Sequence, residues 1–187
     1  MKKIITALFA VLIVAAATVT LAACGGDDDN DQPTTYKSGV LTFYYGTTAD
    51  EVDIADISFV INGTAITTQK SDFQELSDSE ISASIKSKGF TKFYKKEIPV
   101  SSLPSTVKIE TTVKAKDIIL TAEKYNVGQF MQLSFKPSGS TKSFMEDNGG
   151  TWNTVKAAGV SSAFNLYNKY GSKTYTIQTT GKIVSAN

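Results

Sequence analysis

The sequence predicts a mainly β protein, a single β-sandwich with one or two short helices. Runs rich in β-branched and aromatic residues recur along the chain and are separated by turn residues. Several of these runs alternate apolar and polar residues, which is the period of a strand with one buried face. Parallel α/β folds need helices between most strands, and such helical patterns are scarce here.

The first predicted elements are an opening strand and a hairpin. Residues 40–45 are β-branched, aromatic or apolar and form the opening strand. Residues 54–61 form the next strand and lead into Asn62-Gly63, with residues 64–68 as the return strand. Asn-Gly between two apolar runs favours the left-handed backbone of a two-residue hairpin turn.

A short helix is predicted over residues 78–88. Ser77 and Glu80 have the spacing of a capping box, in which both side chains bond to free backbone donors at a helix start. Ile81 and Ile85 then lie on one face of the helix, and a glycine follows it as a natural stop.

Three strands are predicted in the middle of the chain. Residues 90–100 include Pro99, which is tolerated at sheet edges, so this segment is an edge-type strand. Residues 107–113 and 131–135 alternate apolar with polar side chains, and each is a strand with one wet face.

Residues 152–170 have two interpretations. The preferred one is a helix, because several apolar residues fit a 3.6-residue period. These residues are Trp152, Val155, Ala163, Leu166 and Tyr170. The rival is a hairpin in which residues 164–167 pair with 173–179. Residues 175–179 form a strand in either case, and residues 183–184 extend it or return along it.

The N-terminal residues have the pattern of a signal peptide. The chain begins with two lysines after Met1, and residues 4–23 are an apolar run that closes with Leu21, Ala22, Ala23 and Cys24. This ending resembles the lipobox of bacterial lipoproteins. The resemblance implies cleavage after Ala23, removal of residues 1–23, and acyl chains on Cys24 that anchor the chain in a membrane. A transmembrane helix is the alternative, and the Ala-Ala-Cys ending disfavours it.

Residues 24–36 are predicted to be an acidic tether before a domain at residues 37–187. Asp27, Asp28 and Asp29 follow two glycines, and a segment of this composition has too few apolar groups to order itself. It resembles the surface-export signal of Bacteroidota lipoproteins, which implies the outer membrane and exposure at the cell surface. The aspartate spacing lacks the glycine and glutamate of an EF-hand loop, so no metal site is predicted.

The β-rich body resembles, in its pattern of short strands, the immunoglobulin-like sandwiches of surface lipoproteins. It lacks the paired cysteines and central tryptophan of true immunoglobulin domains. Cys24 is the only cysteine, so no intrachain disulfide is possible.

The composition excludes several kinds of chemistry. The chain has no histidine, which rules out Ser-His-Asp triads and histidine metal sites. All 19 basic residues are lysine and the net charge is +1, which argues against a nucleic-acid partner. We expect no cofactor and no enzymatic activity. A carboxylate pair, Glu146 and Asp147 beside Trp152, is the remaining catalytic alternative, with residues 147–150 read as a turn.

Three aromatic residues are possible ligand contacts: Trp152, Tyr44 and Tyr45. Adjacent strand residues face opposite sides, so one of the two tyrosines is expected to reach solvent. The predicted function is a non-enzymatic binding or accessory module for an unknown glycan or protein, held at the membrane by acyl chains on Cys24. The alternative is a structural subunit resembling fimbrillins, and a carboxylate-based glycoside hydrolase is the third possibility.

Overall fold

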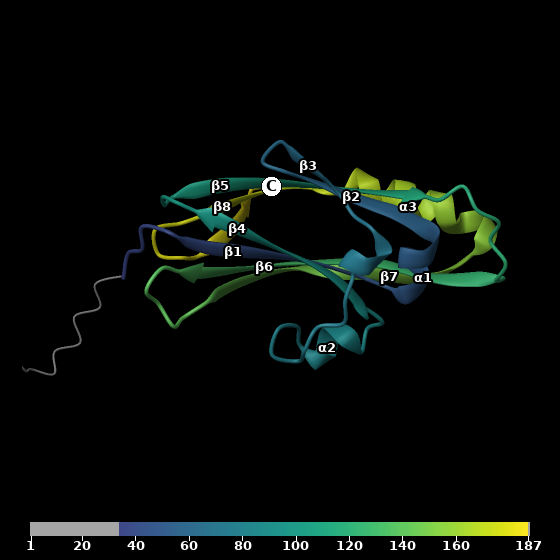
Figure 1. The fold of residues 1–187 in the computed structure, drawn as a ribbon, viewed down its shortest axis with the longest axis horizontal. Coiled ribbons are helices and arrows are strands. Elements are labelled where there is room, and N and C mark those ends of the chain that lie inside the picture. The colour runs from purple at the N-terminus through teal and green to yellow at the C-terminus, as the bar shows by residue number, and fades with distance from the viewer. Residues whose placement is uncertain (1–33, 187) are drawn as a thin grey trace, which may run out of the picture. The chain divides into compact units, whose positions relative to one another are not determined.

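The computed structural model describes residues 34–186, which form two antiparallel sheets packed face to face (Figure 1). The strands in this part of the chain are β1 (Gly39–Thr47), β2 (Ala55–Ile61), β3 (Thr64–Thr67), β4 (Lys92–Val100), β5 (Ser105–Ala115), β6 (Lys124–Pro137), β7 (Phe144–Lys156), β8 (Ser172–Ile177) and β9 (Ile183–Ala186). Sheet A has the order β4-β1-β6-β7, and sheet B has the order β3-β2-β5-β8-β9. The predicted β-sandwich is therefore confirmed.

The helices in the described residues are short. They are α1 (Ala49–Ile54), α2 (Ala83–Lys86) and α3 (Val160–Lys169), with 3-10 turns at Lys70–Asp72 and Ala157–Gly159. Helix α1 carries the chain from β1 in sheet A to β2 in sheet B. Among the described residues, no helix has the length and apolarity needed to span a bilayer.

Several local predictions are confirmed. Asn62 and Gly63 have φ angles of 49° and 81°, as a two-residue turn between β2 and β3 requires. Strand β4, which contains Pro99, lies at the edge of sheet A. Strand β5 alternates buried and exposed positions over most of its length, and β9 returns along β8.

The space between the sheets is filled mainly by aromatic rings. Phe59 of sheet B packs against three rings of sheet A, with centroids 5.3 Å from Phe43, 5.2 Å from Tyr45 and 4.8 Å from Tyr94. Such ring pairs add to the free energy gained from burying apolar area, so this cluster holds the two sheets together.

The outer face of sheet A carries a second apolar core. A segment that includes α2 packs against this face, as Figure 1 shows below the sheet. The buried residues of this second core are Tyr44, Ile81, Ile85, Phe90, Phe93 and Phe130. Tyr44 is 7% exposed and Tyr45 is 0% exposed. The expectation that one of these tyrosines reaches solvent is wrong, because both faces of β1 are covered.

The helix predicted over residues 78–88 is much shorter, since only α2 is helical. The Glu80 carboxylate does accept the Ser77 backbone N–H at 3.4 Å, but residues 78–80 form a turn. Ser82 then adopts extended angles before the helix begins. Ile81 and Ile85 both enter the second core, as two residues on one face would, but the predicted helix length is wrong.

Both interpretations of residues 152–170 are wrong in part. The first residues belong to β7, and the helix begins only at Val160. Its buried residues are Val160, Phe164 and Tyr167, whereas Leu166 is 52% exposed. The predicted apolar face was therefore out of phase. No hairpin joins residues 164–167 to β8, which instead pairs with β5 and β9.

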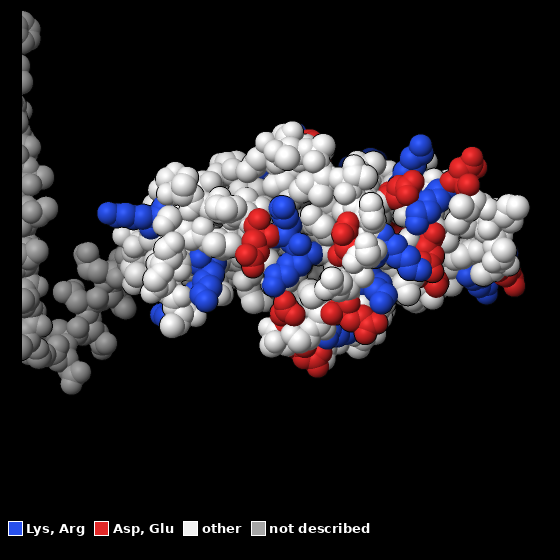
Figure 2. Space-filling model, viewed as in Figure 1, with Lys and Arg blue, Asp and Glu red and all other residues white. Residues whose placement is uncertain are grey.

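Charges of both signs are interspersed on the face shown in Figure 2. The segment that covers the outer face of sheet A, residues 74–91, makes three ion pairs within itself or with β4. They are Lys86–Asp78, Lys92–Glu75 and Lys95–Glu80. Exposed pairs of this kind contribute little stability. The apolar contacts of the second core therefore hold this segment in place.

The second core is tested by one substitution made at two isoleucines. Ile81→Ala should lower the free energy of unfolding by about 2–5 kcal/mol, because Ile81 is fully buried. Ile119→Ala is the matched control and should change it by less than about 0.5 kcal/mol, because Ile119 is 90% exposed. Urea denaturation followed by fluorescence measures both. Equal effects of the two substitutions would contradict the assignment of Ile81 to the second core.

Candidate functional site

The residues of the predicted anchor lie outside the described part of the chain. These are Leu21, Ala22 and Ala23, the acylated Cys24, and the tether aspartates Asp27, Asp28 and Asp29. Near the start of the described residues, the Tyr36 backbone N–H donates to the Thr179 carbonyl at 2.6 Å.

Trp152 is the one predicted contact residue that is substantially exposed, at 42%. It lies opposite Gly128 on the outer face of β7, and its indole covers Gly89. A Cβ at Gly89 would lie 2.5 Å from the indole nitrogen. Part of the Trp152 ring is therefore used in covering Gly89, and the rest stays exposed.

Glu146 and Asp147 do not form a facing pair of carboxylates. Glu146 lies opposite Leu133, an inner-core residue, and Asp147 lies opposite Gln132 on the outer face. Residues 147–150 are not a turn between strands, which corrects the prediction. They form a bulge in β7, where the Asp147 carboxylate accepts the Gly149 N–H at 2.7 Å.

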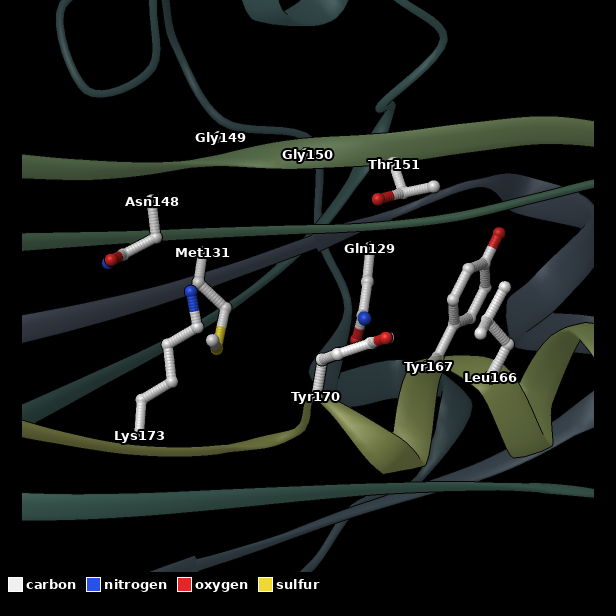
Figure 3. Close-up of a pocket in the computed structure, with 10 residues that line it drawn as sticks. All are labelled: Gln129, Met131, Asn148, Gly149, Gly150, Thr151, Leu166, Tyr167, Tyr170 and Lys173. Carbon is white, nitrogen blue, oxygen red and sulfur yellow. The ribbon is translucent and has the colours of Figure 1, made fainter. Parts of the chain in front are cut away.

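A cleft of about 380 Å³ opens beside this bulge, between the two sheets (Figure 3). Strand β7 is the edge of sheet A, and within the described residues β9 pairs with β8 from Thr174 to Ile177. Lys173 lines the cleft just before this paired stretch, and α3 closes the space at one end. The volume lies in the range of small-ligand sites.

The cleft has an apolar part and a polar part. Met131, Leu166 and Tyr170 supply apolar surface, and Tyr170 is 59% exposed. The other lining residues are Gln129, Asn148, Gly149, Gly150, Thr151, Tyr167 and Lys173. Amides and hydroxyls both donate and accept hydrogen bonds, so this lining suits a ligand with several polar groups.

Asn148 and Lys173 reach into the cleft from opposite sheets, as Figure 3 shows. The Asn148 side-chain nitrogen is buried and has no hydrogen-bond partner among the described residues. Buried donors are usually paired, so a free one inside a cleft is a site where a ligand gains affinity. Rotation of the amide presents its donor or its acceptor to a ligand.

A buried carboxyl group, Glu51, ties α1 to the neighbouring strand β6. It is fully buried, and it accepts the Gly128 N–H at 2.7 Å and the Tyr45 hydroxyl at 3.4 Å. Burial raises the pKa of Glu51 to about 7, although the hydrogen bond from Gly128 opposes the rise. Glu51 does not line the cleft, so its part is structural.

No carboxylate is among the residues that line the cleft. The described residues also hold no group of three or more Asp, Glu, Cys or His side chains placed to bind a metal. Comparison of the chain with protein-family models, with curated proteins and with solved structures finds no match.

The sequence does not group Gln129 and Asn148 with each other or with Tyr170 and Lys173, because these residues come from three separate stretches of the chain. One signal for Lys173 was present. It lies two residues before Tyr175 and four before Ile177, in phase with side chains that were predicted to face the core. A lysine in the same phase as core residues indicates that the inner face of this strand is open to solvent at that position.

Glu51 generates a pH-dependent stability. Its pKa is about 7 in the folded state against 4.5 ordinarily, so the unfolded chain ionises first as the pH rises. The contribution of Glu51 to the free energy of unfolding is greatest below about pH 4.5. It falls by about 3 kcal/mol between there and pH 7, and is constant above pH 7. We expect Glu51→Gln to remove this fall and to be the more stable protein at about pH 8.

Denaturation at a series of pH values measures the effect. Asp53→Asn, which neutralises an exposed carboxylate of the same helix, is the control and should retain the slope of the wild type. An unchanged slope in Glu51→Gln would contradict the assignment.

Proposed function

We propose that this chain is a non-enzymatic binding module anchored at the bacterial cell surface, and that its cleft binds a saccharide. The observation that carries the proposal is the set of side chains in the cleft. Gln129 and Asn148 offer amides to hydroxyl groups, and Tyr170 offers an exposed ring to the apolar face of a sugar.

The free amide donor of Asn148 supports a ligand at this position rather than at Trp152. Trp152 lies on the opposite face of β7 and is partly used in covering Gly89. A saccharide in the cleft would lie between β7, α3 and β8, all of which are parts of the packed sandwich. Such a site is largely preformed, which reduces the entropy cost of binding.

The anchor is proposed from the sequence. Acyl chains on Cys24 bury many methylene groups in the bilayer, so attachment would be stable. The resemblance of residues 24–36 to surface-export signals supports the outer membrane as the location and the cell surface as the place where the cleft meets its ligand.

One observation favours a second function, a subunit of a surface appendage. Strand β7 is a 13-residue edge strand whose second side is unpaired within the described residues. The regular stretch of this edge over residues 151–156, beyond the bulge, is the part that accepts a strand from another chain. In that case purified full chains would form a ladder of oligomers resistant to mild heating, whereas the binding module is expected to migrate as a single species.

The anchor is tested with Cys24→Ser. We expect the wild-type full chain to sediment with membranes, with an intact mass that shows loss of residues 1–23 and gain of acyl chains. The variant should carry no acyl chains and should not sediment with membranes, because serine has no thiol to accept the lipid. A wild-type chain with a bare Cys24 thiol would overturn the proposed location.

The cleft is tested by filling it. Thr151 faces inward and lines the cleft, so Thr151→Trp should reduce saccharide binding by about tenfold or more. Thr154→Trp places the same ring on the outer face of β7 and should bind as the wild type does. An array of neutral and acidic saccharides probed with the full chain in detergent measures both. Absence of any saccharide binding would contradict the proposal.

A further inference from the structure

Within the described residues, Lys173 is a charged residue on the otherwise uncharged inner face of sheet B. It lies opposite Ile109 of β5, which in turn lies opposite Ile61 of β2. Directly opposed residues of antiparallel strands project from the same face, so Lys173 projects toward sheet A with two core isoleucines in its row. The other inward positions of the described strands of sheet B are apolar, hydroxyl-bearing or small.

Lys173 has no acidic partner among the described residues. It is half-buried, and it is absent from the five ion pairs that these residues form. Half-burial separates a cation from part of its water, which makes an anionic partner more favourable than at the open surface. The cleft itself supplies no such anion, because no aspartate or glutamate lines it.

Glu146 is the inward-facing carboxylate of β7, two residues before Asn148. It does not line the cleft or pair with Lys173. Its charge acts on Tyr175, whose hydroxyl pKa is raised mainly by burial and further by Glu146. The negative charge of Glu146 therefore disfavours binding of an anion in the cleft, but Glu146 does not pair with the Lys173 ammonium group.

We propose that the cleft selects saccharides that carry a carboxylate, as uronic acids do, with Lys173 as the counter-ion of that carboxylate. This inference rests on the proposed saccharide-binding function. The ammonium group donates charge-assisted hydrogen bonds to the acid, Asn148 and Gln129 bind ring hydroxyls, and Tyr170 contacts the apolar face of the sugar. One lysine balances one carboxylate.

A peptide carboxylate fits the cleft less well than a sugar acid. Peptides bind sheet edges by continuing the hydrogen-bond ladder, which needs a regular edge strand. Strand β7 is bulged where it lines the cleft: Phe130 lies opposite Gly150, and Gln132 lies opposite Asp147. A peptide strand could not keep its register across this bulge. A compact ring needs no ladder.

The experiment compares matched pairs of methyl glycosides that differ only in carboxylate against hydroxymethyl, such as methyl glucuronide with methyl glucoside and methyl galacturonide with methyl galactoside. Calorimetric titration of the full chain in detergent gives the affinities. We expect the acid of at least one pair to bind about tenfold more tightly than its neutral partner, as one added charge-assisted hydrogen bond predicts.

Variants assign the selectivity to one side chain. Lys173→Met keeps an unbranched stem and should bring acid and neutral affinities together, whereas Lys136→Met removes an exposed lysine of β6 outside the cleft and should retain the preference. Glu146→Gln should strengthen binding of the acid, because it removes a negative charge from the inner face.

The outcomes separate the two proposals. Neutral sugars that bind as tightly as acids would overturn the role of Lys173 while leaving a saccharide site. Preference for an acid that survives in Lys173→Met would also overturn it. Tighter binding of N-acetyl-triglycine than of any sugar acid would assign the cleft to peptide carboxylates and overturn both proposals.

Discussion

Sheet A carries large apolar side chains on both faces, and the rest of the domain is arranged around their burial. Tyr45 projects inward to meet Phe59, and Tyr44 projects outward into the second core, which also contains Ile81 and Phe93. Burying a large aromatic side chain contributes about 1.5–3 kcal/mol. Leaving the outer face in water would forfeit that contribution at each ring. The segment over residues 76–90 therefore serves as a third layer, although it contains little regular structure.

Because both faces of sheet A are covered, its β7 edge is where inward-facing polar groups meet solvent. Within the described residues, β9 pairs with β8 from Thr174 to Ile177 and α3 closes one end, and the cleft opens between them. Asn148 and Lys173 both line this opening and reach into it from opposite sheets. In the closed parts of the same two sheets, inward residues are mostly apolar.

Glu51 links these parts through the backbone of β6. Its carboxyl group holds the Gly128 N–H, and the next residue, Gln129, lines the cleft. A buried acid with a raised pKa is a common sign of a catalytic group. Here the acid is enclosed and lies away from the cleft, so its energetic effect is on folding. The hydrogen bond fixes the strand from which one ligand-facing amide projects.

The sequence by itself determined the strands whose alternation is local and the hairpin at Asn62-Gly63, because side-chain period and turn chemistry act over a few residues. It also determined the pattern of the anchor at Cys24 and the absence of histidine. Only the tertiary structure decided that Tyr44 is buried, that residues 152–156 are strand, and that Lys173 faces Asn148 across a cleft. Each of these depends on which distant segment covers a face, and local periodicity carries no information about that choice.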